Sequence, residues 1–146
     1  RNVARLAKHP NAFGIKEASG NIGYATKIAR YLSDDFCMFS GNDDIVLPMM
    51  ALGSRGVISV WANVQPKEVH DMCHAWLAGD RDAALKTQLA GIELVDSLFC
   101  EVNPIPVKYA LELMGFGKAV YRQPLCEPSD AAKATIAEAM RNAGII

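Results

Sequence analysis

Short apolar segments alternate with helical patterns through the first half of the chain, and this alternation constrains the fold more than any other feature. The segments span 12–17, 36–40 and 56–61. The first segment ends in the charged pair Lys16 and Glu17, but short continuous apolar runs of this kind are typical of strands covered on both faces. Because strands separated by helices pair in parallel, the pattern predicts successive βα units. The helices around them are expected over 2–8, 22–32, 45–52 and 66–77.

The ends of these helices carry recognisable signals. The turn at 19–21 provides a capping side chain for the helix that follows it. Asp43 is predicted to cap the helix over 45–52, and Asp44 suits the positive amino end of that helix. Pro48 lies inside the same helix, so we expect it to bend the helix or to remove one backbone hydrogen bond.

After residue 79 the pattern changes to helices alone. A long helix is expected over 81–99, and its inward face is predicted to be Leu85, Leu89, Ile92, Val95 and Phe99. A proline-containing turn at 103–106 leads into a helix that ends at Met114. After an extended link over 121–128, Ser129 caps a last helix with Ala132, Ile136 and Met140 facing inward.

Three parallel strands do not make a closed fold by themselves, since an open sheet leaves both edges unpaired. A (β/α)8 barrel uses about 250 residues, which exceeds the 146 of this chain. We therefore predict an α/β fold in which about three βα units of a (β/α)8 TIM barrel precede an α-helical C-terminal domain. The partial barrel is assigned to residues 1–79 and the helical domain to residues 80–146.

Composition excludes several functional classes. The chain is 51% hydrophobic with a formal net charge of −1, which is unlike a disordered segment. Its 15 basic residues are balanced by 16 acidic ones, which disfavours a nucleic-acid partner. No apolar run approaches the roughly 20 residues that span a bilayer, and no signal peptide is evident. We expect a cytoplasmic protein without a membrane partner, whose four scattered cysteines are reduced and mostly buried.

Lys16 is the most informative residue for function. It lies at the end of the apolar segment 12–17, and the active sites of βα barrels gather at the carboxyl ends of the strands. Apolar neighbours would lower the pKa of a lysine there and populate the free amine. Such an amine attacks a keto carbonyl to form a Schiff base. On the local pattern alone, a lysine that extends into solvent is the simpler interpretation.

Four motifs occur in a fixed order along the chain. They are Phe13-Gly14-Ile15-Lys16-Glu17-Ala18-Ser19-Gly20-Asn21, Phe39-Ser40-Gly41-Asn42-Asp43-Asp44, Gly56-Val57-Ile58-Ser59-Val60 and Asn103-Pro104-Ile105-Pro106-Val107-Lys108. Their order and spacing resemble the C-terminal half of the dihydrodipicolinate synthase family over essentially the whole chain. The wider superfamily includes N-acetylneuraminate lyase and keto-sugar-acid aldolases, but the last motif is more similar to the synthases.

The resemblance implies the C-terminal part of a TIM barrel that assembles as a homo-oligomer and uses neither cofactor nor metal. In the family, a lysine condenses with pyruvate, and the resulting enamine adds to aspartate semialdehyde in lysine and diaminopimelate synthesis. By motif position, the Schiff-base lysine is Lys16. Ile58 matches a strand residue that lines the pyruvate pocket, and Gly41 matches a glycine whose backbone borders the active site. Small or backbone-presenting residues fit there, because the keto acid must lie close to the chain.

Other catalytic groups of the family have no match in this sequence. The resemblance assigns a Gly-Thr-Thr-Gly-Glu type loop, a catalytic tyrosine, a carboxylate-binding arginine and a lysine-feedback site to the N-terminal half. None of Tyr24, Tyr31, Tyr109 and Tyr121 takes the place of that tyrosine in the motif order. The chain also does not begin with Met, which we interpret as processing or as a segment of a longer protein. We therefore expect activity to require an N-terminal half of the barrel.

Three functional hypotheses stay open: the synthase, a related keto-sugar-acid aldolase, and a noncatalytic half-barrel that serves in assembly. Among weaker signals, His70 and His74 share one helix face as in a zinc motif, but they lack a third ligand and are predicted to be solvated. Asp43 and Asp44 are explained more simply by helix capping than by magnesium binding. Lys108 is expected to hold the helical domain in place.

Overall fold

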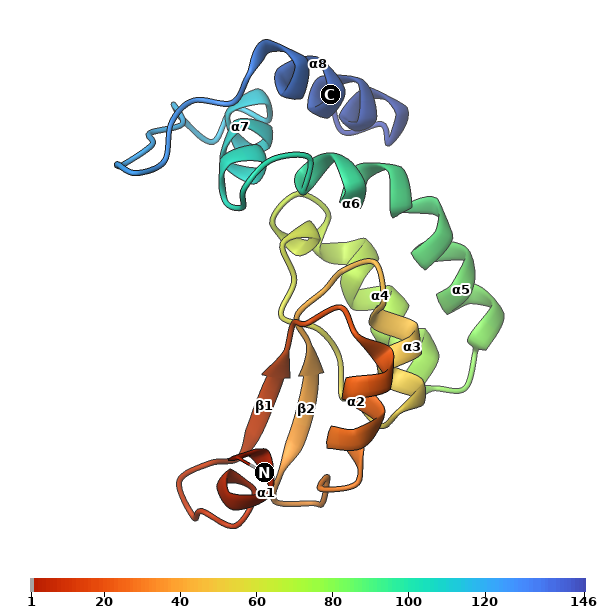
Figure 1. Cartoon of the computed structure of the whole chain (residues 1–146). Coiled ribbons are helices and arrows are strands. Elements are labelled where there is room, and N and C mark those ends of the chain that lie inside the picture. Colours follow the sequence, from red (N-terminus) through yellow and green to blue (C-terminus); the bar gives the residue numbers. More distant parts are fainter. Residues whose placement is uncertain (1) are drawn as a thin grey trace.

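The computed structural model describes residues 2–146, in which helices alternate with two parallel strands and a succession of helices then follows (Figure 1). Arg1, the first residue of the predicted barrel domain, lies outside the described residues. The strands are β1 (Gly14–Glu17) and β2 (Cys37–Ser40). They pair in parallel with Gly14 opposite Cys37 and Glu17 opposite Ser40, which confirms the predicted parallel pairing.

The third predicted strand, over 56–61, is reduced to one bridge. Val57 pairs in parallel with Ser40, and the backbone N–H of Ile58 donates to the Ser40 carbonyl at 2.8 Å. The segment therefore lies beside β2 on the side away from β1. Beyond it, the chain turns into a short 3-10 helix, η1 (Trp61–Asn63).

This prediction of a full strand is wrong because the backbone amides that would extend it are engaged elsewhere. The N–H groups of Val60 and Trp61 donate to Asp43 Oδ2 at 2.8 and 3.0 Å. Two amides directed at one carboxylate cannot at the same time continue a regular ladder with β2.

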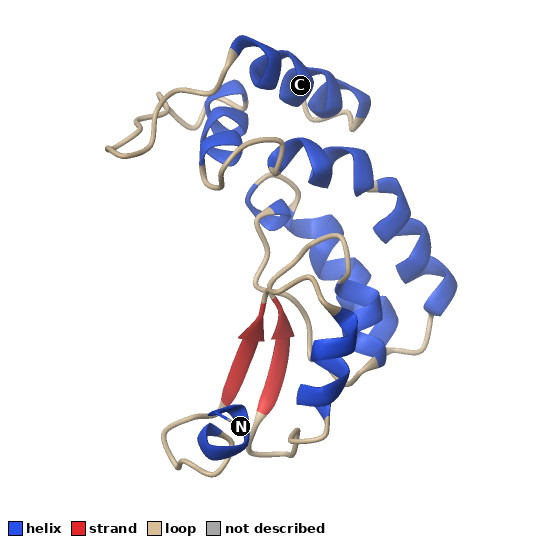
Figure 2. Cartoon of the chain, viewed as in Figure 1, coloured by secondary structure: helices blue, strands red, loops and turns tan. Residues whose placement is uncertain are grey.

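Four helices accompany the strands: α1 (Asn2–Leu6), α2 (Ile22–Ala29), α3 (Val46–Ala51) and α4 (Pro66–Leu77). Figure 2 shows α2, α3 and α4 to one side of the two strands, with α1 near their amino ends. A small core joins α2, β2 and α3 through Ala25, Ile28, Met38 and Met49. One face of β2 is therefore covered by helices.

The capping predictions are confirmed at α2 and wrong at α3. Asn21 Oδ1 accepts the N–H of Tyr24 at 2.9 Å at the amino end of α2. At α3 the cap position is Ile45, without a side-chain hydrogen bond, because Asp43 is directed at Val60 and Trp61 instead. Pro48 lies in the first turn of α3, where a missing N–H leaves no helical bond unmade.

The long helix predicted over 81–99 is two helices, α5 (Arg81–Ala90) and α6 (Ile92–Leu98), which meet at Gly91. A Cβ atom on Gly91 would lie 2.3 Å from the ring of Trp61. The backbone therefore passes so close to the indole that any residue with a side chain would clash with it. The ring is 1% exposed. Packing against Trp61 therefore coincides with the break between the helices.

The predicted inward face of α5 is also wrong. Leu85 and Leu89 are 48% and 63% exposed, whereas Ala84 and Gln88 are buried. Gln88 Nε2 donates to the Asp43 carbonyl at 2.8 Å, so this helix presents a polar side chain to the loop after β2. Phe99, predicted to face inward, is likewise 42% exposed.

The remaining helices, α7 (Ile105–Leu113) and α8 (Asp130–Asn142), lie beyond the carboxyl ends of the strands (Figure 1). Ser129 Oγ accepts the N–H of Ala132 at 3.2 Å, as its predicted capping role requires. The predicted inward residues of α8 are buried in the main core: Ala132, Ile136 and Met140. Lys108 Nζ donates to the Val120 carbonyl at 2.6 Å, which ties the link after α7 to that helix.

All four cysteines are free thiols. Cys37 is buried and Cys73 half-buried, but Cys100 and Cys126 are exposed, so the expectation of mostly buried cysteines is wrong for these two. They lie in the turn after α6 and in the link before α8, where little of the chain packs over them. Among residues 2–146, no helix combines the length and the apolar character needed to cross a membrane.

Candidate functional site

The carboxyl ends of β1 and β2 and the segment around Val57 lie side by side. Glu17 is opposite Ser40, and Ser40 in turn bridges to Val57. Since all three segments run in the same direction, the residues at their ends gather at one edge. Lys16, Gly41 and Ile58, the three residues predicted from the motifs, all belong to this edge.

These three residues also share one face of the sheet. Lys16 is paired in register with Phe39, and side chains alternate between faces along a strand. Gly41 follows Phe39 by two residues and so lies on the same side. Ile58 follows Val57, the partner of Ser40, and therefore also lies on the side of Lys16. The structure brings the predicted site residues together, although their roles stay predictions.

Gly41 is in direct contact with the Lys16 side chain. A Cβ atom on Gly41 would lie 2.9 Å from Lys16 Cε and 2.4 Å from Ala18 Cβ. Its N–H also donates to the Glu17 carbonyl at 2.7 Å, which continues the pairing of the two strands past their ends. The stem of Lys16 thus crosses the bare backbone of Gly41, and glycine is needed here because of this close approach.

The surroundings of Lys16 differ from the sequence-based expectation. Its side chain is exposed, and Ile58 is 48% exposed. Our prediction that apolar groups enclose the lysine is therefore wrong within the described residues, 2–146. The face that carries Lys16 and Ile58 is open to solvent in this chain.

Glu17 holds the turn that follows Lys16. It projects to the opposite face of β1 and is 4% exposed. Its Oε1 accepts the N–H of Ser19 at 3.0 Å, so the chain turns immediately after the strand. This short hydrogen-bonded turn fixes the backbone on the carboxyl side of Lys16.

Asp43, predicted from the sequence to cap a helix, instead positions the third segment of the site. It is 1% exposed, and its Oδ2 accepts the two amides that follow the segment bearing Ile58. The loop after β2 thereby fixes the path of the third segment. An aspartate that caps its own helix and one that accepts distant amides look alike in sequence, so no local signal distinguished these roles.

A hollow of about 190 Å³ lies between the loop after β2 and helix α6. The loop after β2 and helix α6 line it with Asn42, Asp43, Asp44, Val95, Asp96 and Phe99. Three carboxylates and no basic side chain line this space, and one of them, Asp43, already accepts the amides of Val60 and Trp61. No cluster of three or more metal-ligating side chains occurs among residues 2–146.

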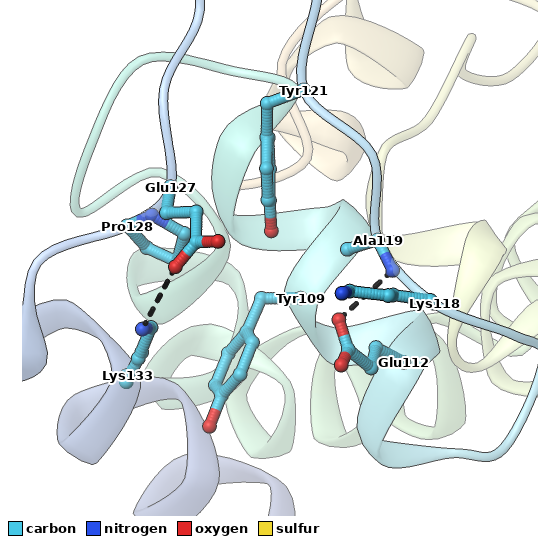
Figure 3. Close-up of a pocket in the computed structure, with 8 residues that line it drawn as sticks. All are labelled: Tyr109, Glu112, Lys118, Ala119, Tyr121, Glu127, Pro128 and Lys133. Atoms are coloured by element: carbon cyan, nitrogen blue, oxygen red, sulfur yellow. Dashed lines mark hydrogen bonds and ion pairs between the residues drawn. The ribbon is translucent and has the colours of Figure 1, made fainter.

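A second, smaller hollow lies in the helical domain. Figure 3 shows Tyr121 and Tyr109 with Glu112 and Lys118 on one side and Glu127 and Lys133 on the other. Its volume is about 80 Å³. Burial raises the pKa of Tyr121, and the nearby Glu112 and Glu127 raise it further. With balanced charges and none of the three predicted site residues in its lining, this hollow is not the candidate catalytic site.

Comparisons with known proteins agree with the motif resemblance. The chain matches the Dihydrodipicolinate synthetase family over residues 1–143. It is 42% identical over 144 residues to 4-hydroxy-tetrahydrodipicolinate synthase of Alkaliphilus oremlandii, covering 99% of this chain and 50% of that one. The chain thus spans about half the length of the curated relatives that it matches.

Solved structures match over the same extent. Dihydrodipicolinate synthase from Thermotoga maritima aligns with a TM-score of 0.94 and 34% identity, covering 99% of this chain and 50% of that chain. The chloride-inhibited synthase from Acinetobacter baumannii, complexed with pyruvate, aligns with a TM-score of 0.92 and 36% identity over the same shares. These matches confirm the predicted fold class, the C-terminal part of a TIM barrel followed by a helical domain.

Proposed function

The chain belongs to the dihydrodipicolinate synthetase family, and we propose that it supplies the Schiff-base lysine, Lys16, of a 4-hydroxy-tetrahydrodipicolinate synthase. The observation that carries this proposal is the contact of Lys16 with the bare backbone of Gly41 at the carboxyl edge of the strands. Active sites of βα barrels form at this edge. A lysine there, beside a backbone without side-chain bulk, leaves room for a small keto acid.

The proposed chemistry is a class I condensation. The free amine of Lys16 attacks the keto carbon of pyruvate, and loss of water from the carbinolamine gives a Schiff base. Loss of a proton from the methyl group gives an enamine, whose carbon adds to the aldehyde carbon of aspartate semialdehyde. Ile58 is proposed to contact the apolar part of pyruvate, and the backbone of Gly41 to border the bound keto acid.

The curated relatives support the synthase over the related aldolases. Those of Alkaliphilus oremlandii and Thermodesulfovibrio yellowstonii, 42% and 43% identical over almost the whole chain, are named 4-hydroxy-tetrahydrodipicolinate synthase. The hollow lined by Asp43, Asp44 and Asp96 does not separate the two hypotheses, because aspartate semialdehyde carries a carboxylate as well as an ammonium group.

We also propose that the 146-residue chain alone does not turn over substrate. The resemblance assigns the proton-transferring tyrosine and the carboxylate-binding arginine to the other half of the barrel. A positioned acid or base contributes about 10²–10⁴-fold to rate, and a positioned carboxylate contact adds to this. The working enzyme is accordingly proposed to be a cytoplasmic homo-oligomer that contains both halves.

Trapping of the Schiff base tests the role of Lys16. The chain is incubated with pyruvate and borohydride, and the reduced adduct is mapped by mass spectrometry. We expect the adduct at Lys16, and we expect Lys16→Ala to abolish it. Lys86→Ala serves as the matched control, because Lys86 is an exposed lysine on α5. An adduct at Lys86 or Lys108 with Lys16 unmodified would contradict the proposal.

A coupled activity assay tests the need for the other half. We expect no turnover from the 146-residue chain and recovery of activity when a separately expressed N-terminal half is added. Turnover by the chain alone at the rate of a complete synthase would refute the proposed division of roles.

A further inference from the structure

Two histidines lie one helical turn apart on the outer face of α4. His70 and His74 are both exposed, and the opposite face of the helix buries Val69 and Met72. The imidazole rings are stacked, with centroids 4.0 Å apart and an angle of 25° between their planes. The sequence alone indicated a solvated pair, but it did not reveal that the rings lie together.

A neighbouring carboxylate orients one of these rings. His70 Nδ1 lies 3.0 Å from Asp71 Oδ1. Because a carboxylate only accepts hydrogen bonds, Nδ1 carries the proton and the lone pair of the neutral ring is on Nε2. Asp71 is itself paired with Lys67, and this contact and the bond to His70 both lower the pKa of Asp71. Carboxylates that orient histidines in this way are common behind metal ligands.

We propose that His70 and His74 chelate a divalent transition-metal ion of the class of Cu²⁺, Ni²⁺ or Zn²⁺. Two nitrogens at the usual distance of about 2 Å from one ion lie roughly 3 Å apart. In the structure the rings are stacked and nearly parallel, so both exposed side chains rotate out of the stack before their nitrogen lone pairs converge on one ion. Imidazole nitrogen suits these metals, whereas Mg²⁺ and Ca²⁺ prefer oxygen ligands.

Water completes the coordination sphere, since no third metal-ligating residue joins the pair among residues 2–146. The chelate closes across one turn of α4 and requires that turn to be helical. Metal binding therefore favours the folded chain over the unfolded one. This site is independent of the function proposed above, because neither histidine belongs to the edge that carries Lys16.

Titration calorimetry with Ni²⁺ as the probe tests the proposal. The experiment uses the full chain with Cys100→Ser and Cys126→Ser, so that exposed thiols do not compete for the ion. We expect one Ni²⁺ per chain and no binding of Mg²⁺. Because two linked ligands bind one ion far more tightly than either alone, we expect His70→Gln and His74→Gln each to weaken binding about 100-fold or more.

The third histidine of the chain, His9, provides the matched control. We expect His9→Gln to bind Ni²⁺ as the parent does, and circular dichroism to show unchanged helicity in all three variants. Removal of one exposed imidazole should leave α4 folded, since its buried face is untouched. The proposal would be overturned if the double variant His70→Gln/His74→Gln bound Ni²⁺ as tightly as the parent. It would also be overturned if the parent bound two Ni²⁺ ions weakly and independently and each single variant bound one.

Discussion

The stem of Lys16 passes so close to Gly41 that a Cβ atom there would lie 2.9 Å from Lys16 Cε. Lys16 belongs to β1 and Gly41 directly follows β2, and the hydrogen bond from the Gly41 N–H to the Glu17 carbonyl joins the ends of these two parallel strands. The path of the Lys16 side chain therefore depends on the backbone at Gly41 as well as on the backbone of β1. This relationship makes Gly41 the most direct mutational test of the site.

We predict that Gly41→Ala slows Schiff-base formation at Lys16. The new methyl group must displace the lysine stem or the backbone at Ala18, and a misplacement of about 1 Å lowers rates roughly 100-fold. The rate of pyruvate trapping by borohydride is measured per folded chain, with the folded fraction taken from circular dichroism. Gly23→Ala, at an exposed helical glycine of α2, should trap pyruvate normally. Trapping by Gly41→Ala at the parent rate would contradict the packing argument.

Gly91→Ala is predicted to destabilise the helical domain. The added Cβ would lie 2.3 Å from the Trp61 ring, and forcing an extra group into a packed core costs about 1–3 kcal/mol. Urea unfolding measures the change. Trp61→Phe removes part of the indole, so the double variant should lose less than the sum of the two single losses. Additive losses would show that Gly91 and Trp61 do not interact as described.

Removal of the Asp43 carboxylate should loosen the third segment of the site. Asp43→Ala leaves the amides of Val60 and Trp61 without their acceptor, at a cost of about 1–3 kcal/mol for each buried group left unpaired. Asp43→Asn retains an acceptor oxygen and should lose less. Urea unfolding ranks the two variants, and hydrogen exchange at Val60 and Trp61 should accelerate in Asp43→Ala. Unchanged exchange there would contradict the positioning role.

The order of elements was predictable from sequence because it depends on local patterns. β1, β2 and α8 were predicted from apolar runs, a cap at Ser129 and helical spacing. The errors arise where the local structure depends on a contact with a residue that is distant in the sequence. Asp43 bonds to amides 17 and 18 positions away, and the helix break at Gly91 coincides with the ring of Trp61. Neither contact could be predicted from a local sequence pattern, because such a pattern covers only neighbouring residues.

In the candidate site, too, the residues could be predicted from the sequence but their surroundings could not. The motifs identified Lys16, Gly41 and Ile58, and parallel strands bring such ends together without further information. The environment of Lys16 was mispredicted because enclosure depends on whatever covers the open face of the sheet. The apolar residues around Lys16 in the sequence predict that it lies in a strand, but they do not predict what surrounds its side chain.

The cysteines are predicted to differ in reactivity at pH 8. Burial raises the pKa of Cys73, with Asp43 adding to the effect, and burial and Glu101 raise the pKa of Cys100. A raised pKa leaves less of the reactive thiolate at this pH. Iodoacetamide labelling followed by mass spectrometry should therefore modify exposed Cys126 first, Cys100 more slowly, Cys73 later and buried Cys37 last. Raising the pH should accelerate Cys73. Labelling of Cys73 before Cys126 would contradict this order.

The last prediction concerns the open face and edge around β1. The strand pairs only with β2 among residues 2–146, so its other edge offers unpaired backbone groups. Phe13, which immediately precedes it, is 75% exposed, and Ile58 is 48% exposed. Because apolar surface in contact with water costs about 25 cal/mol per Å², we expect the chain to self-associate and to cover this face.

Analytical ultracentrifugation at micromolar concentration measures the association, and two phenylalanines provide a matched pair of variants. Phe13 and Phe116 are equally exposed at 75%, but only Phe13 adjoins β1. Loss of a buried phenylalanine contact of about 2 kcal/mol weakens association more than tenfold. Phe13→Ser should therefore raise the dissociation constant by that factor, while Phe116→Ser leaves it unchanged. A compact, cooperatively melting monomer would show that the open face of β1 does not drive assembly.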